Sequence, residues 1–121
     1  MKRILLLLLL CSTTLLMAQQ TDPIQEAMAS YDYETALSLI AQKKPATPLL
    51  LQKGKALRSL GLNAEALSTY QEIIGKDSTN TRALIEAAEC CRTLAKYKQA
   101  SAYYEKVLDL TPENKYVRIQ Y

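Results

Sequence analysis

Residues 81–114, TRALIEAAECCRTLAKYKQASAYYEKVLDLTPEN, repeat the pattern of the 34 residues that precede them, 47–80, TPLLLQKGKALRSLGLNAEALSTYQEIIGKDSTN. Each block begins with Thr and ends with Asn. Aligned position by position, the blocks share Thr47/Thr81, Leu50/Leu84, Arg58/Arg92, Leu60/Leu94, Ala66/Ala100, Tyr70/Tyr104 and Asn80/Asn114. A repeat of this length is typical of helical arrays, in which each unit buries its apolar face by stacking on a neighbour. It predicts an all-α fold and favours a scaffold over an enzyme.

The apolar spacing inside each block predicts two helices. Leu50, Gly54 and Leu57 are separated by four and three residues, which places them on one face of a helix. Ala66 and Tyr70 form a second such stripe, and small residues in both stripes mark points where helices approach closely. The second block repeats these positions with Leu84, Ala88, Cys91, Ala100 and Tyr104. No segment shows the two-residue alternation of a half-buried strand, so we predict no sheet.

This pattern resembles the tetratricopeptide repeat family, which has two antiparallel helices in each 34-residue unit. The residues that match its defining positions are Leu50, Gly54, Leu57, Ala66, Tyr70, Leu84, Ala88, Cys91, Ala100, Tyr104 and Pro112. Lys53 and Ser78 depart from the family pattern, at positions that favour Leu and Pro. The resemblance implies tetratricopeptide-repeat helical hairpins stacked as a short right-handed α-solenoid.

The chain divides into five segments. They are a signal peptide at 1–18, a degenerate N-terminal helical pair at 22–46, repeats at 47–80 and 81–114, and the start of a further repeat helix at 115–121. Asp22-Pro23 and Thr47-Pro48 each place a good N-cap before a proline, and Asn63 is placed to cap the second helix of its block. The first pair is called degenerate because Ala36 lies 30 residues before Ala66, and terminal repeats are often atypical.

Residues 1–18 have the pattern of a targeting segment. Two basic residues precede a wholly apolar run at 4–10, and a second apolar run ends at Ala18. A stretch this short is typical of a bacterial secretory signal peptide and not of a spanning helix. It predicts export to the periplasm or cell envelope, with cleavage after Ala18 and contact with the membrane through this segment alone. The alternatives are an uncleaved membrane anchor and lipidation at Cys11.

The C-terminal residues 115–121 begin a first repeat helix and then stop, which leaves the last full helix with little cover. A complete array normally ends on a helix with a polar outer face. Either the chain is a fragment of a longer protein, which we favour, or its open end docks onto something, including self-association with another copy.

Composition argues against several function classes. Without Lys2 and Arg3 of the signal segment, 13 basic side chains face 12 acidic ones, and no basic stripe suggests nucleic acid as a partner. The chain contains no histidine, and it shows no phosphate loop, nucleophile elbow or metal-ligand spacing. We therefore predict no enzyme activity, no catalytic residues, no cofactor and no metal.

Cysteines and tyrosines are expected to pack within the fold. Cys90 and Cys91 are adjacent, so a bridge between them would strain a helix, and packing is favoured over a redox pair or a half-site for metal. Tyr97 and Tyr103 are expected to pack between repeats, although a stacking platform is the alternative.

In the tetratricopeptide family the first helices line a concave groove. Carried over by repeat position, the groove residues are Leu51, Gln52, Lys55, Arg58, Ser59, Arg82, Ile85, Glu86, Glu89, Arg92 and Thr93. Arg58 and Arg92 share one position and are expected to hold carboxylates of an extended peptide, unless they are solvated or pair with Glu86 and Glu89. The carboxylate-clamp pattern of cytosolic cochaperones is absent, because Lys55 and Glu86 stand where it needs Asn.

The sequence therefore predicts a non-catalytic interaction module of the bacterial envelope that binds a protein or peptide segment of unknown identity in this groove. One alternative is a structural subunit that assembles by end-on stacking. Another is the N-terminal repeat part of a longer enzyme or sensor.

Overall fold

The computed structural model describes residues 21–120, and every regular element within them is a helix. The helices are α2 (Pro23–Ala29), α3 (Tyr33–Ala41), α4 (Thr47–Ser59), α5 (Asn63–Lys76), α6 (Thr81–Thr93), α7 (Tyr97–Leu110) and α8 (Lys115–Gln120). The predicted all-α fold is confirmed. In this part of the chain no helix is long and apolar enough to cross a membrane. The signal peptide at 1–18 and Tyr121 lie outside the described residues.

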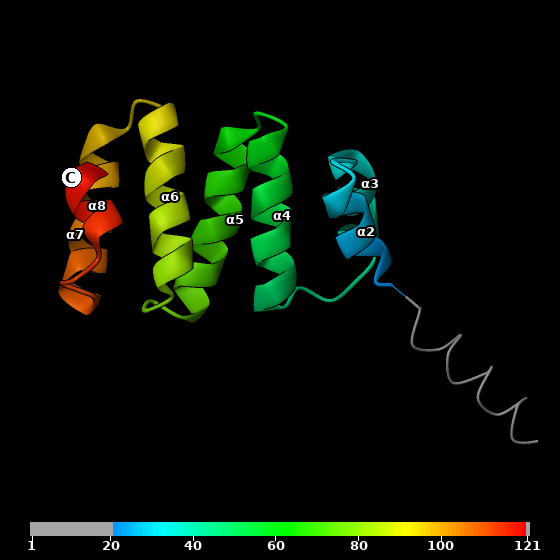
Figure 1. Ribbon diagram of the computed structural model, residues 1–121, viewed down its shortest axis with the longest axis horizontal. Helices are drawn as coiled ribbons and strands as arrows, with labels where there is room; N and C mark the ends of the chain where they lie inside the picture. The colour runs from blue at the N-terminus through cyan, green and yellow to red at the C-terminus, as the bar shows by residue number, and fades with distance from the viewer. Residues whose placement is uncertain (1–20, 121) are drawn as a thin grey trace, which may run out of the picture.

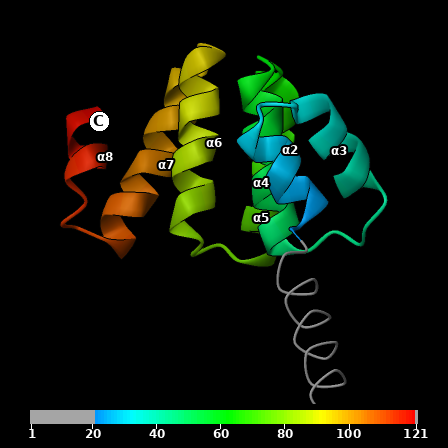
Figure 2. The same ribbon diagram turned by 45° about the vertical axis from the view of Figure 1, so that its right-hand side comes forward.

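The helices stack in chain order, as a solenoid. Each helix packs against the next one along the chain, from α2 on α3 to α7 on α8. Figure 1 shows α4, α5, α6 and α7 as a row of nearly parallel rods, with the shorter α2–α3 pair at one end and α8 beside α7 at the other. In Figure 2, after a turn of the molecule, α8, α7 and α6 still follow one another, and α2 is seen in front of α4. The α2, α4 and α6 helices are the first members of successive pairs.

The same type of turn connects the first helix to the second in the pairs α2–α3, α4–α5 and α6–α7. Tyr31, Gly61 and Ala95 each follow the first helix with a positive φ, of 60°, 78° and 58°. In each turn the next amide donates to a carbonyl five residues earlier; Leu62 N, for example, donates to Leu57 O at 2.8 Å. This is a Schellman ending, which requires a left-handed residue after the helix and is easiest with glycine.

Asparagine and aspartate side chains begin most helices. Asp22 caps α2, and Asp32 caps α3 by accepting from Thr35 N at 3.2 Å. Asn80 and Asn114, the last residues of the two blocks, accept from Ala83 N at 3.0 Å and Val117 N at 3.1 Å. The Asn that ends each 34-residue block is therefore the N-cap of the next helix.

Two expected caps were wrong. Leu50 N donates to Ala46 O, so α4 is capped one residue before Thr47, at Ala46, without a side-chain bond. In the same way Leu62 caps α5, while the side-chain amide of Asn63, through Nδ2, donates back to Gly61 O at 3.3 Å. Both polar residues lie inside the first helical turn.

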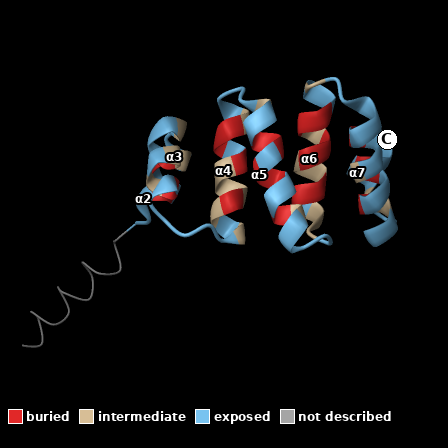
Figure 3. Ribbon diagram, turned by 180° about the vertical axis from the view of Figure 1, so that it is seen from behind, coloured by how far each residue is buried: buried red, intermediate tan, exposed pale blue. Residues whose placement is uncertain are grey.

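The core follows the two apolar stripes. Of the residues that match defining positions of the repeat, Leu50, Gly54, Leu57, Ala66, Tyr70, Leu84, Ala88, Cys91, Ala100 and Tyr104 are buried, whereas Pro112 is exposed. Figure 3 shows this buried stripe running along α4, α5 and α6. The expectation that Tyr97 packs between repeats was wrong: its side chain is 66% exposed. Tyr103 is half-buried, and its hydroxyl accepts from Gln71 Nε2 at 3.2 Å.

Candidate functional site

The face built by α2, α4 and α6 is hollowed by two adjoining cavities. The larger, of about 510 Å³, lies between α2 and α4 and is lined by Gln25, Met28, Leu51 and Gln52 among others. The smaller, of about 350 Å³, lies between α4 and α6 and reaches down to Tyr70 of α5. Lys55 and Arg82 line both cavities, so the two form one continuous depression.

Tyr70 reaches the floor of the smaller cavity because α4 carries a glycine opposite it. A Cβ atom added at Gly54 would lie 2.4 Å from Tyr70 Cζ and 2.8 Å from its hydroxyl oxygen. The tyrosine ring therefore lies directly against the α4 backbone and is only 2% exposed. Burial raises the pKa of the Tyr70 hydroxyl, which keeps it a neutral hydrogen-bond donor.

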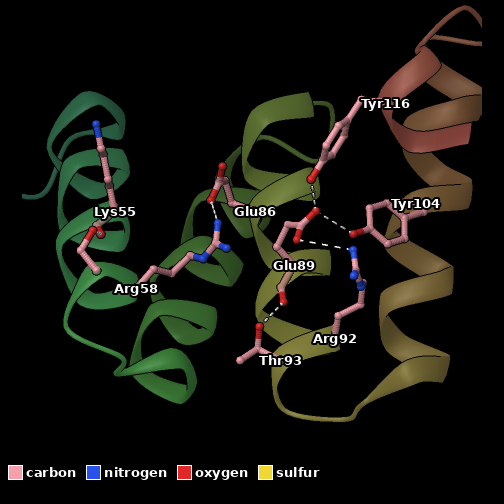
Figure 4. A network of polar contacts seen from close by, with 9 residues as sticks. Lys55, Arg58, Glu86, Glu89, Arg92, Thr93, Tyr104 and Tyr116 are labelled. Atoms are coloured by element: carbon pink, nitrogen blue, oxygen red, sulfur yellow. Dashed lines mark hydrogen bonds and ion pairs between the residues drawn. The ribbon is translucent and has the colours of Figure 1, made fainter. Parts of the chain in front are cut away.

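A polar link joins each repeat to the next. Arg58 of α4 forms an ion pair with Glu86 of α6, and Arg92 of α6 donates to Gln120 of α8. Both links join residues 28 apart, at equivalent positions of successive blocks. Burial opposes the charge of Arg58, but its hydrogen bond to Glu86 helps to raise the guanidinium pKa above its ordinary value. Figure 4 shows the Arg58–Glu86 pair bridging the two helices.

A second cluster surrounds Glu89. Its carboxylate accepts hydrogen bonds from Tyr104, at 3.0 Å, and from Tyr116, and it lies 3.7 Å from Arg92 Nη1 (Figure 4). The hydrogen bond to Glu89 is the main cause that raises the pKa of Tyr116 to about 12. For Tyr104, burial is the main cause of a raised pKa. The cluster ties α6 to both α7 and α8.

The structure divides the predicted groove residues into two groups. Seven of them line the cavities: Leu51, Gln52, Lys55, Arg58, Ser59, Arg82 and Glu86. Ile85 is instead partly buried against the core, and Thr93 donates to the Glu89 carbonyl at 3.0 Å. Glu89 and Arg92 belong to the cluster beside α8. Arg58 and Arg92, which were expected to hold a partner's carboxylates, are thus paired with Glu86 and Glu89 of the chain itself.

Sequence reasoning missed several members of this face. The sequence pattern predicted Tyr70 for the core alone, and it did not place Gln25 or Met28 of α2 on this face. The 28-residue spacing from Arg58 to Glu86 recurs from Arg92 to Gln120, and that recurrence was a readable signal.

Within residues 21–120, no three His, Cys, Asp or Glu side chains are grouped to hold a metal ion.

Comparisons with known proteins show what kind of fold this is. A family model described as tetratricopeptide repeat matches residues 81–114. A search of curated proteins found no match by sequence. Among solved structures, PcrH in complex with the chaperone binding region of PopB has a TM-score of 0.69 at 19% identity, covering 80% of this chain and 84% of PcrH.

Two further structures are similar over the same extent. The first repeat domain of Spaghetti, bound to the HSP90 peptide SRMEEVD, has a TM-score of 0.72 at 22% identity and covers 80% of both chains. The Arabidopsis OM64 domain has a TM-score of 0.72 at 18% identity, covering 80% of this chain and 84% of that one. Identities this low show a shared fold. The chain is a helical-repeat solenoid with the fold of these tetratricopeptide-repeat structures, and its residues 81–114 match the model of that repeat.

Proposed function

We propose that the chain is a non-catalytic interaction module that holds a protein or peptide segment along the face of α2, α4 and α6. The observation that carries this proposal is the continuous depression formed by the two cavities, which share Lys55 and Arg82. A depression of this kind, with apolar side chains beside polar ones, suits a segment that offers both kinds of contact. PcrH and Spaghetti, which share the fold, were solved with a PopB region and an HSP90 peptide.

The experiment is a peptide-display selection on the protein, followed by calorimetric titration of the best peptide. Gln52→Arg places a long charged side chain in the larger cavity, and we expect it to weaken binding about tenfold, which corresponds to about 1.4 kcal/mol. Ser68→Arg on α5 is the matched control, because Ser68 is exposed and lines neither groove cavity. A peptide that binds both variants as it binds the wild type would show that this face is not the binding surface.

The location in the bacterial envelope belongs to the same proposal. Its support is the basic and apolar pattern of residues 1–18. Expression of the whole chain in a Gram-negative host, fractionation, and intact mass measurement test it. A periplasmic product that begins at Gln19 is the expected result, and a full-length product in the cytoplasm would contradict it.

End-on assembly is a second candidate, favoured by the apolar surface of α8. Val117 packs into the core, but Ile119 on the same helix is 81% exposed. An exposed apolar side chain on a helix that has one packed face can serve as a contact for another helix. Sedimentation of the wild type and of Ile119→Lys separates the candidates: assembly through α8 should be lost in the variant, while peptide binding by the groove should be retained.

A further inference from the structure

Two equivalent positions of the repeats carry opposite charges. Lys55 and Glu89 occupy the same position of the 47–80 and 81–114 blocks, on α4 and α6. Tyr70 and Tyr104 are likewise equivalent, on α5 and α7. The two sites can therefore be compared as two versions of one backbone arrangement.

In the second block, a carboxylate of the chain itself occupies the place between the first and second helices. Glu89 accepts a hydrogen bond from the buried Tyr104 hydroxyl at 3.0 Å. The same carboxylate lies 3.7 Å from the guanidinium of Arg92. The arrangement shows that this position of the fold can hold a carboxylate between a tyrosine hydroxyl and a cation.

In the first block, no carboxylate of residues 21–120 bonds to the equivalent tyrosine, because Glu86, which lines the same cavity, is paired with Arg58. Lys55 stands in place of Glu89, and the Tyr70 hydroxyl faces the cavity of about 350 Å³. Tyr70 is 2% exposed, and none of the described residues forms a hydrogen bond with its hydroxyl. The hydroxyl oxygen keeps some accessible surface, because no fully buried polar side-chain atom of the described residues lacks a partner. A buried hydroxyl that opens into a polar cavity is a donor available to a ligand.

The charge of this cavity favours an anion. Its charged lining residues are Lys55, Arg58, Arg82 and Glu86. Arg58 and Glu86 neutralise each other in their ion pair. Lys55 and Arg82 are the lining cations for which the described residues provide no ion pair, so the cavity has an excess of positive charge.

We propose that this cavity binds one carboxylate of the segment held in the groove, with the Tyr70 hydroxyl as donor and Lys55 and Arg82 as counter-charges. The partner's carboxylate takes the place that Glu89 takes in the next block. An acidic side chain and a C-terminal carboxylate share this chemistry. The inference rests on the proposed groove function and names the acidic character of the segment that fits it.

The test uses N-acetyl-glutamate amide as the probe and N-acetyl-glutamine amide as its uncharged match, with binding followed by amide chemical shifts of the ¹⁵N-labelled protein. We expect the acidic probe to shift amides of α4 and α6 around Lys55 and Arg82 and the neutral probe to bind at least about tenfold more weakly, because the cavity recognises charge. N-acetyl-aspartate amide and a dipeptide with a free C-terminus distinguish an acidic side chain from a terminal carboxylate.

Lys55→Glu is the decisive variant. It supplies from within the carboxylate that Glu89 supplies in the next block, so we expect a folded protein that loses binding of the acidic probe. Lys53→Glu makes the same charge change on the same helix, but Lys53 does not line this cavity. We expect it to retain affinity within about twofold, because charges outside the cavity are screened by salt. Tyr70→Phe keeps the ring and removes the donor, and should weaken binding about fivefold.

Equal losses in Lys55→Glu and Lys53→Glu would overturn the proposal, since the effect would then be general repulsion. Equal binding of the acidic and neutral probes would overturn it as well. The selected display peptide separates this failure from that of the groove. If Gln52→Arg weakens the peptide and Lys55→Glu does not, the groove stands and the carboxylate site falls. If neither variant weakens it, both fall.

Discussion

Substitution of Gly54 by Ala tests the close contact between α4 and α5 on which the smaller cavity depends. The new Cβ would lie 2.4 Å from Tyr70 Cζ and 2.6 Å from Cε1. The clash involves ring carbons of a side chain that is 2% exposed, so the ring has little room to retreat. Overpacking of this kind costs about 1–3 kcal/mol. The better helix propensity of alanine offsets about 1 kcal/mol of this cost.

Gly75→Ala supplies the control that isolates the clash. Gly75 lies in α5, and nothing is within 4 Å of a Cβ built on it, so this substitution should stabilise the protein by about 0.5–1 kcal/mol. The difference between the two variants is then the overpacking cost, about 1–3 kcal/mol, read from urea midpoints at constant slope. If Gly54→Ala proves as stable as Gly75→Ala, the ring does not lie against the α4 backbone. Gly54→Ala with Tyr70→Leu should recover most of the loss.

Three further predictions concern packing, turns and thiols. Ala66→Leu or Ala100→Leu places a large side chain where helices meet and should cost about 1–3 kcal/mol; denaturant melts unchanged by both would contradict the stacked-pair packing. Gly61→Ala should destabilise the protein by about 1 kcal/mol, because alanine is strained at a positive φ. Ala95→Gly, at the equivalent left-handed turn, should be neutral or stabilising. Shifts of the melting temperature of the same size and sign in the two variants would contradict the shared turn geometry. Burial raises the pKa of the Cys90 thiol to about 11 from an ordinary 9.0, so the folded state keeps this proton where the unfolded state loses it. Stability should therefore fall as pH rises from 9.0 to about 11, less steeply in Cys90→Ala, and a thiol reagent at pH 8 should react with Cys90 only on unfolding.

The helices were predictable because stacking constrains them on two sides. Leu50 and Leu84, or Tyr70 and Tyr104, must each pack against a partner helix and a neighbouring repeat, so their spacing reveals both the period and the buried face. The helix starts were less predictable. Pro48 fits the first turn of α4 whether the cap is Thr47 or Ala46, and the choice depends on which carbonyl accepts the first helical bond.

The state of the groove side chains could not be predicted in the same way. Repeat position places Arg58 and Arg92 on one face. Whether each arginine is paired depends on the side chain at the sixth position of the following block, which lies on the first helix of that block. Glu86 and Gln120 stand there, and both accept from the arginine of the preceding repeat. The cations that remain available in the depression are thus Lys55 and Arg82, which differ from their equivalents and leave no periodic signal.

Charge therefore changes along the face while packing does not. A buried position serves the same contact in each repeat, so Leu50 and Leu84 are alike; a groove position contacts solvent or a partner and is free to differ, as Lys55 and Glu89 do. Because Arg92 balances the charge of Glu89, whose carboxylate also accepts from two tyrosine hydroxyls, the α6 end of the face offers a bound segment little net charge. The α4 end keeps its excess of positive charge. A bound acidic segment should consequently place its negative charge over α4, which fixes its position and direction along the groove more strongly than apolar contacts alone would.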